Sequence, residues 1–252
     1  MGDGDAIFIQ SPSQENCLID TGNLITGFKV TKYLEQQGID SLDHLIFTHS
    51  HLDHIGGAFF VLQMFDVKNV YDNGECLSES VDLQDIHSLY RVLLRTGGSY
   101  RSLNEGDAIT LGAVKLNVLW PPKEFSDSGI NANSIIIMVE YEGFSCLLTG
   151  DLINSVEKLL IEKEIILKAD VLKVGHHGAA DANSEEFLNK VSPGIAIISV
   201  GEENTRGYPS GDVIERINKS KIKLYRTDKD GDVLLNIYKE KPFNIKIKTS
   251  KE

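Results

Sequence analysis

Residues 48–57 read THSHLDHIGG and hold three of the chain's seven histidines. A short apolar run precedes this stretch and a longer apolar segment follows its two glycines, which predicts a strand, a turn and a helix. Alternate residues of an extended strand end point the same way, so the stretch offers two neighbouring groups of side chains. Imidazoles with a carboxylate are ligands for zinc, manganese or iron. The alternative, a polar loop that caps the next helix, does not need this spacing. The pattern therefore predicts two adjacent metal sites that include His49, His51, Asp53 and His54.

A further acidic candidate follows the apolar strand expected at residues 144–149. Asp151 comes there directly after Gly150. A carboxylate has two oxygens and can bridge two cations about 3.5–4 Å apart. Aspartate is also a common helix N-cap, here for the segment that starts at Ile153. Beside the first cluster, we favour the bridging role.

The pair His176-His177 ends another apolar strand and lies between two glycines. One histidine of the pair can bind the second metal, while the other supports it or acts on substrate; the sequence does not decide which. Five of the seven histidines thus fall into two strand-end turns. His44 opens a strand and His87 lies in a helical pattern, so both are expected to be structural.

Charge and cysteine content restrict the function classes. The formal net charge of −12 means that the surface as a whole repels nucleic acid, so a polyanionic substrate must be met at a local site. The three cysteines form no C-x-x-C pair, which favours reduced thiols and a cytoplasmic location. The N-terminus lacks the pattern of a signal peptide, and no apolar run reaches about 18 residues. We expect neither export nor a membrane segment.

Strand and helix patterns alternate along the whole chain. No linker, repeat or low-complexity tract divides it, so we expect one domain over residues 1–252, with two sheets face to face and helices outside. One helix follows the histidine turn. The other expected helices are 28–37, 83–94, 153–161, 184–191 and 212–218, and the expected strands are 6–10, 17–20, 44–48, 69–71, 108–111, 114–119, 134–141, 144–149, 169–174, 196–200, 223–225 and 233–237.

These motifs together resemble the metallo-β-lactamase fold superfamily, whose members are four-layer αβ/βα sandwiches and metallohydrolases. The chain is similar in particular to the ComEC-type branch, the soluble domain attached to the competence DNA-uptake channel and its free-standing relatives. The resemblance covers nearly the whole chain, at residues 2–6, 18–22, 49–54, 131–134, 147–151, 170–178 and 226–228.

The resemblance implies a centre of two divalent ions, Zn²⁺ or Mn²⁺, and a hydroxide between them as nucleophile. Its metal ligands would be His49, His51, Asp53, His54, Asp151, His176 and His177. Asp53, His177, Tyr208 and Lys173 are the catalytic candidates, and Asn131, Asn133, Ser134 and Asn204 are the substrate-binding candidates. Several of these, Lys173 and the asparagines among them, have turn or packing roles as an alternative.

Three features depart from the family. The family's further histidine between the first motif and the bridging aspartate is missing here, and its place falls near Asn133-Ser134, so oxygen ligands or water would complete the first site. Tyr208 stands where relatives carry a histidine, which keeps a hydrogen-bond donor but loses a base. The family's first strand precedes the turn at which this chain begins, so that strand is dispensable or the natural chain is longer.

The leading functional hypothesis is a metal-dependent phosphodiesterase or nuclease acting on single-stranded DNA or a small phosphodiester. Its expected partner is a DNA-uptake membrane channel encoded separately. One alternative is hydrolysis of a small ester, such as a phosphorylcholine ester, a lactone or a thioester, on the same centre. The other is a metal-binding regulatory module without turnover, which would need metal for stability only.

Overall fold

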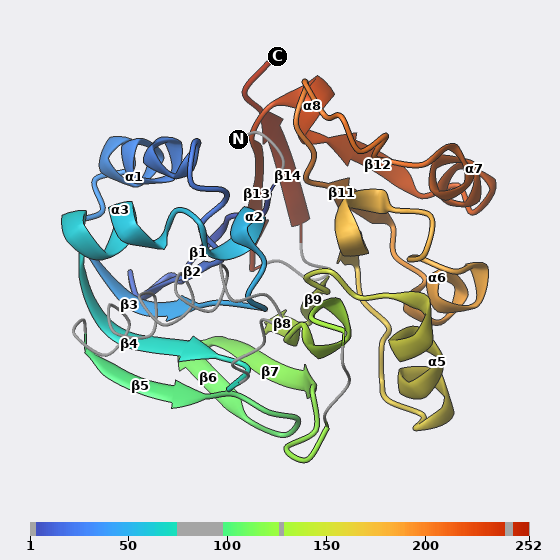
Figure 1. Cartoon of the computed structure of the whole chain (residues 1–252), viewed down its shortest axis with the longest axis horizontal. Coiled ribbons are helices and arrows are strands. Elements are labelled where there is room, and N and C mark those ends of the chain that lie inside the picture. Colours follow the sequence, from blue (N-terminus) through green and yellow to red (C-terminus); the bar gives the residue numbers. More distant parts are fainter. Residues whose placement is uncertain (1–3, 75–97, 126–128, 240–243, 252) are drawn as a thin grey trace.

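The computed structural model describes residues 4–74, 98–125, 129–239 and 244–251. Two large β-sheets face each other, and helices cover both outer faces (Figure 1). The helix expected at residues 83–94, with His87, lies outside the described residues, as does Cys76. Within the described residues, none of the helices is long and apolar enough to cross a membrane.

The first sheet has five strands in the order β1-β2-β3-β4-β5. β1 and β2 form an antiparallel hairpin, and the remaining neighbours pair in parallel. The strands are β1 Ile7–Gln10, β2 Asn16–Ile19, β3 Ser41–Ile46, β4 Asp66–Asp72 and β5 Ser99–Ser102. Helices α1 (Gly27–Gln36) and α3 (Ala58–Met64) lie on its outer face, where Leu34 and Val61 pack against Leu45.

The second sheet has seven strands in the order β12-β11-β10-β9-β8-β7-β6. They are β6 Ala108–Leu111, β7 Val114–Trp120, β8 Ile136–Tyr141, β9 Phe144–Leu148, β10 Val171–Lys173, β11 Ile195–Ile198 and β12 Lys223–Arg226. Helices α5 (Asn154–Glu162), α6 (Glu185–Val191) and α7 (Gly211–Lys219) cover its outer face. The short helix α8 (Thr227–Asp230) leads to the hairpin of β13 (Val233–Tyr238) and β14 (Asn244–Thr249). The sequence patterns had not indicated β14.

One strand, β8, shows how the layers are held together. Its residues Ile137 and Val139 join the apolar cluster between the two sheets, whereas Ile136 and Met138 join the cluster under the second set of helices. Successive side chains of a strand point to opposite faces, so a strand buried on both sides reads as a continuous apolar run. The expected four-layer αβ/βα sandwich is confirmed.

The strand ends that carry polar side chains meet at one edge of the sandwich. β9, β10 and β11 are parallel neighbours, so their carboxyl ends lie side by side. The chain after β3 joins them, because the Ile135 amide donates to the Thr48 carbonyl at 2.9 Å. Gly150 has φ +49°, and a Cβ there would lie 3.1 Å from Ser134 Cβ and 3.2 Å from Thr48 Cβ. Glycine thus lets the end of β9 approach the histidine turn.

We predict that Gly150→Ala destabilises the fold by about 1–2 kcal/mol, because alanine is strained in the left-handed region and its Cβ crowds both sheets. Urea unfolding would measure the change. Gly211→Ala is the matched control: a Cβ at that helix start meets no atom within 4 Å, and its effect should stay within about 0.5 kcal/mol. Equal losses in the two variants would contradict the close approach.

Candidate metal centre

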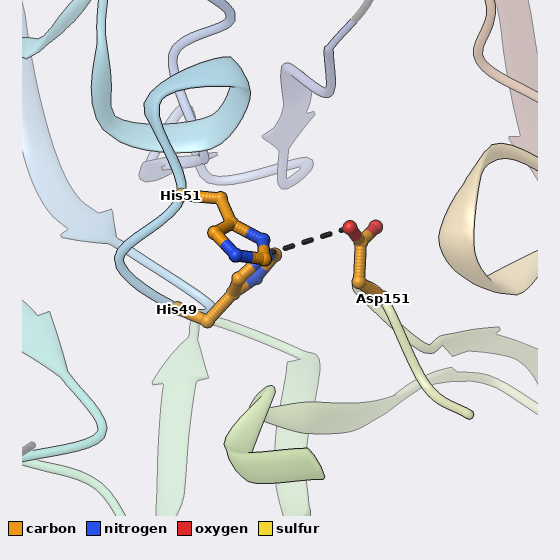
Figure 2. A group of neighbouring side chains, drawn as sticks. All are labelled: His49, His51 and Asp151. Carbon is orange, nitrogen blue, oxygen red and sulfur yellow. Dashed lines mark hydrogen bonds and ion pairs between the residues drawn. The ribbon is translucent and has the colours of Figure 1, made fainter. Parts of the chain in front are cut away.

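Three strand ends bring the candidate ligands together. The loop after β3 carries His49 and His51, and the single turn α2 (Leu52–Ile55) that follows carries Asp53 and His54. Asp151 follows β9. Figure 2 shows His49 and His51 reaching from one side and Asp151 from the other. The 3₁₀ turn Gly175–Gly178 after β10 carries the histidine pair His176 and His177.

The carboxylate of Asp151 lies between the two strand-end turns. Its Oδ2 lies 3.5 Å from His49 Nε2 and 3.9 Å from His176 Nε2. Its Oδ1 lies 3.2 Å from His54 Nε2 and 3.4 Å from His177 Nε2. Each oxygen therefore faces one histidine from each strand-end turn. The N-cap of α5 is Ile153, so Asp151 does not take the capping role weighed from the sequence.

Three groups of described side chains offer ligand atoms that lie within 4.8 Å of one another. The first is His49, His51 and Asp151, the second is Asp53, His54 and His177, and the third is Asp5, His54 and Asp151. In the first group His49 Nε2 and His51 Nδ1 are 3.1 Å apart. Two nitrogens on one tetrahedral zinc, each at about 2.0–2.1 Å, would be about 3.3 Å apart. The spacing suits two nitrogens that share one cation.

The hydrogen bonds behind the second group fix the tautomers of its histidines. His54 Nδ1 lies 2.7 Å from Asp20 Oδ2, and His177 Nδ1 lies 2.9 Å from the carbonyl oxygen of Ser199. A carbonyl or a carboxylate oxygen accepts here, so each Nδ1 donates, and in the neutral imidazole each Nε2 carries the lone pair. Each Nε2 can thereby bind a cation once it carries no proton.

His49 is oriented by a similar argument through a hydroxyl. Thr48 Oγ1 donates to Asp20 Oδ2 at 2.7 Å, so its own acceptor faces His49 Nδ1 at 3.0 Å. That arrangement also leaves His49 Nε2 unprotonated. Asp20 therefore controls histidines of both groups from behind, one directly and one through Thr48.

Several buried polar atoms at the centre have no hydrogen-bond partner in the part of the chain that the structure describes, and a cation could bind them. Nε2 of His54, Nε2 of His177 and Oδ1 of Asp151 are buried and make no hydrogen bond. An unsatisfied buried polar atom costs on the order of 1–3 kcal/mol. These atoms converge within a few ångströms, and their nitrogen and carboxylate chemistry suits zinc or manganese. The residues present therefore fit a divalent metal.

Two side chains at the middle of the centre carry opposite charges. Burial lowers the pKa of His49, and it lowers that of His51 to about 4. Burial alone would also lower the pKa of His54, but Asp151 and Asp20 hold it well above its usual value. Burial opposes ionisation of Asp151, yet His54 and His177 keep its pKa well below the ordinary range. His54 and Asp151 thus form a charged pair whose proton a cation would displace.

Backbone strain marks the second histidine turn. His176 has φ 50° and ψ 44°, and His177 has φ 51° and ψ 20°, so both lie in the left-handed region. Each costs about 1–2 kcal/mol in a residue with a Cβ. Gly178 must be glycine, because its φ is +80° and a Cβ would lie 2.6 Å from Pro209 Cβ. The strain turns both imidazoles toward Asp151, as strain at functional sites commonly does.

The residues expected to contact substrate take different positions. Ser134 is buried, and its Oγ accepts from the Asp151 amide at 3.2 Å. Asn133 is fully buried and donates to the Gly129 carbonyl at 3.0 Å. Both side chains are therefore held within the fold by these contacts, and Ser134 fixes the backbone at Asp151.

The other polar candidates lie closer to the second histidine turn. Asn131 Nδ2 is 3.2 Å from His176 Nε2. Asn204 Nδ2 donates to the Tyr208 carbonyl at 3.0 Å, so it holds the loop that presents the tyrosine. The Tyr208 ring lies 5.6 Å from the His176 ring and 6.4 Å from the His177 ring, measured between centroids.

Lys173 is the clearest departure from expectation. The sequence analysis named it as a catalytic candidate, but the side chain is buried and its Nζ lies 2.8 Å from Asp5 Oδ2. Asp5 Oδ1 lies in turn 3.6 Å from His177 Nδ1. Lys173 thus supports the centre from behind through Asp5. Asp5 also groups with His54 and Asp151 as a possible ligand, a role that its place in the opening turn did not reveal.

A cleft of about 280 Å³ opens on the centre. It is lined by Ser50, His51, Leu52, Asp53, Ile130, Asp151, His176 and Arg206. Arg206 was not among the residues predicted from the sequence. Its Nη1 donates to Asp53 Oδ2 at 2.7 Å. A single arginine in a polar turn gives no sequence signal for this role, because the contact spans 153 residues of chain.

A four-layer sandwich with histidines and aspartates gathered at its strand ends defines a class of metal-binding folds. The sequence profile described as the metallo-beta-lactamase superfamily matches residues 2–202. The chain belongs to this family.

Relatives and solved structures agree with that assignment. The chain is 32% identical to ComE operon protein 3 of Bacillus subtilis (strain 168), over 92% of this chain and 32% of that protein. It is 28% identical to Competence protein ComA of Neisseria gonorrhoeae, over 91% of this chain and 30% of that protein. The chain thus spans about a third of the length of these relatives. The metallo-β-lactamase fold protein YhfI from Bacillus subtilis shares the fold, with a TM-score of 0.55, 13% identity and 88% of each chain covered.

We predict that Lys173→Met destabilises the protein by about 3–5 kcal/mol, because it leaves the buried Asp5 charge without its partner. Urea unfolding at neutral pH would measure the loss. Asp5→Asn combined with Lys173→Met should recover part of it. Lys239→Met, which breaks an exposed pair of 2.7 Å with Glu142, should change stability by less than about 1 kcal/mol. A Lys173→Met loss as small as this control would contradict a buried pair.

We also predict that metal binding by metal-stripped protein releases a proton near pH 7. The pKa of His54 is raised, so this histidine holds a proton that a cation must displace, and affinity should rise about tenfold per pH unit for each proton released below that pKa. Calorimetric zinc titration in buffers of different ionisation enthalpy would count the protons. His44→Asn should not change the count, because His44 lies outside the centre and contacts Tyr71. A pH-independent affinity would exclude the charged His54.

Proposed function

We propose that this centre hydrolyses phosphodiesters and that its substrate is a single strand of DNA. The observation that carries the proposal is the division of Asp151 between two histidine groups, with buried ligand atoms that make no hydrogen bond. A structural metal site needs one closed set of ligands. Two adjacent groups that share a carboxylate and open on a cleft are more than stability requires.

The chain's own residues divide the work. His49, His51 and Asp151 would hold one cation, and Asp53, His54 and His177 would hold the other, with Asp151 between them. Two such cations lower the pKa of bound water to about 7 and offset the charge of a phosphoryl group. The hydrogen bonds of Asp20, Thr48 and the Ser199 carbonyl keep the imidazoles in place.

The cleft and the overall charge favour a phosphate group as the part of the substrate that enters. The cleft volume of about 280 Å³ is at the lower limit of ordinary ligand pockets, so a phosphate with part of its substituents fits and a longer molecule must extend outside. A net charge of −12 repels polyanions generally. Local cations at the centre would supply the attraction that the surface lacks.

The names of the relatives support DNA as the substrate class. Competence protein ComA is named for competence, the uptake of DNA by cells. We propose on this basis that the chain works in the cytoplasm together with a DNA-uptake channel. These relatives are about three times longer than this chain.

The test is hydrolysis of bis(p-nitrophenyl) phosphate by metal-stripped protein reloaded with zinc or manganese. We expect metal-dependent turnover in the wild type and a loss of at least about 100-fold in Asp151→Asn, which keeps the shape but removes the shared charge. Asp212→Asn, on the first turn of α7, should retain full activity and controls for charge and handling.

Metal-dependent turnover would justify cleavage assays on single-stranded and double-stranded oligonucleotides, with faster cleavage expected on the single strand. Absence of turnover in protein shown to hold two ions per chain would exclude the phosphodiesterase. Hydrolysis of a thioester or lactone by that same protein would then identify the small-ester alternative.

A further inference from the structure

Arg206 occupies the mouth of the cleft from the loop after β11. Its side chain is 49% exposed, and its Nη1 donates to Asp53 Oδ2 at 2.7 Å. The loop is pinned on both sides of it: Asn204 Oδ1 accepts from the Arg206 amide at 2.6 Å, and Asn204 Nδ2 donates to the Tyr208 carbonyl at 3.0 Å. The guanidinium is therefore held over the centre and still reaches solvent.

The charge of Arg206 contrasts with its surroundings. Among the residues that line the cleft it is the one lysine or arginine, while Asp53 and Asp151 supply negative charge. A guanidinium stays protonated and carries five N–H donors in a planar fork that matches two oxygens of a phosphate. An arginine placed there attracts an anion, which is unexpected in a chain of net charge −12.

Asp53 connects this arginine to the metal centre. The same Oδ2 that accepts from Arg206 lies 3.8 Å from His177 Nε2, and Asp53 belongs to the second ligand group. Asp53 thus links the guanidinium to the second ligand group, beside which a reacting group would lie. Arg206 and Asp151 line the same cleft, so the guanidinium can contact a non-bridging oxygen of a phosphate that enters it.

We propose that Arg206 binds an anionic phosphate oxygen of the substrate and makes the site specific for phosphodiesters over neutral esters. This inference rests on the proposed function and adds the residue that recognises the substrate's charge. A neutral ester gains nothing from the guanidinium, so the choice between the two substrate classes depends on this side chain.

The first experiment measures binding without turnover. Inorganic phosphate would be titrated calorimetrically into metal-loaded protein carrying Arg206→Gln, Arg206→Lys or Arg101→Gln. Loss of a charge-assisted hydrogen bond weakens binding on the order of 10-fold or more, so Arg206→Gln should lose at least that much and Arg206→Lys less. Arg101→Gln removes the same charge from the edge strand β5, where the side chain is 53% exposed, and should bind phosphate as the wild type does.

The second experiment compares bis(p-nitrophenyl) phosphate with its neutral methyl triester. For Arg206→Gln we expect KM for the anionic diester to rise on the order of 10- to 100-fold, with kcat changed much less. The kcat/KM for the triester should stay within about threefold of the wild type, because the triester carries no charge for Arg206 to bind.

The outcomes separate this proposal from the proposed function. Weaker phosphate binding in Arg206→Gln supports the anion site. If the wild type also turns over no diester, only the proposed phosphodiesterase function is excluded. If the protein turns over the diester and Arg206→Gln behaves like Arg101→Gln in both experiments, the role of Arg206 is excluded and the phosphodiesterase function is retained. Equal phosphate affinity in the two variants overturns the Arg206 proposal whatever the turnover.

Discussion

The carboxylate of Asp151 is buried between histidines from both halves of the molecule, and the rest of the centre is arranged around it. A buried carboxylate is costly unless charges and donors surround it. Here His49 and His54 approach from the loop after β3, and His177 approaches from the turn after β10. Gly150 is required because only a glycine lets the end of β9 come this close to the facing sheet.

Around that carboxylate the fold arranges a second layer that controls protons. Asp20 accepts from His54 directly and reaches His49 through Thr48, while the Ser199 carbonyl accepts from His177. These acceptors come from both sheets, so the tautomers of the centre depend on correct packing of the whole sandwich. Outer acceptors of this kind commonly set the basicity of metal-binding histidines.

Local patterns predicted the sandwich and most of the candidate ligands, because strand periodicity and the spacing of the histidines are written within short segments. Contacts between distant segments could not be predicted. Lysine is a residue type that usually lies on the surface, and only the fold shows that Lys173 is buried against Asp5. Arg206 and Asp53 are 153 residues apart, so neither position indicates the other. Near Asn133, where the family's further histidine was expected to be missing, the structure has buried packing and the hydrogen bond of Ser134 to the Asp151 amide.

The division of ligands between the two sheets has a consequence for the lifetime of the protein. A cation held at the centre would join the loop after β3 to the strand ends after β9 and β10, as a cross-link would. A ligand that binds only the folded state stabilises it by about 1.4 kcal/mol for each tenfold excess over its dissociation constant. Unfolded chains are the ones that cellular proteases remove, so the cell's supply of the metal would set how much of this protein survives.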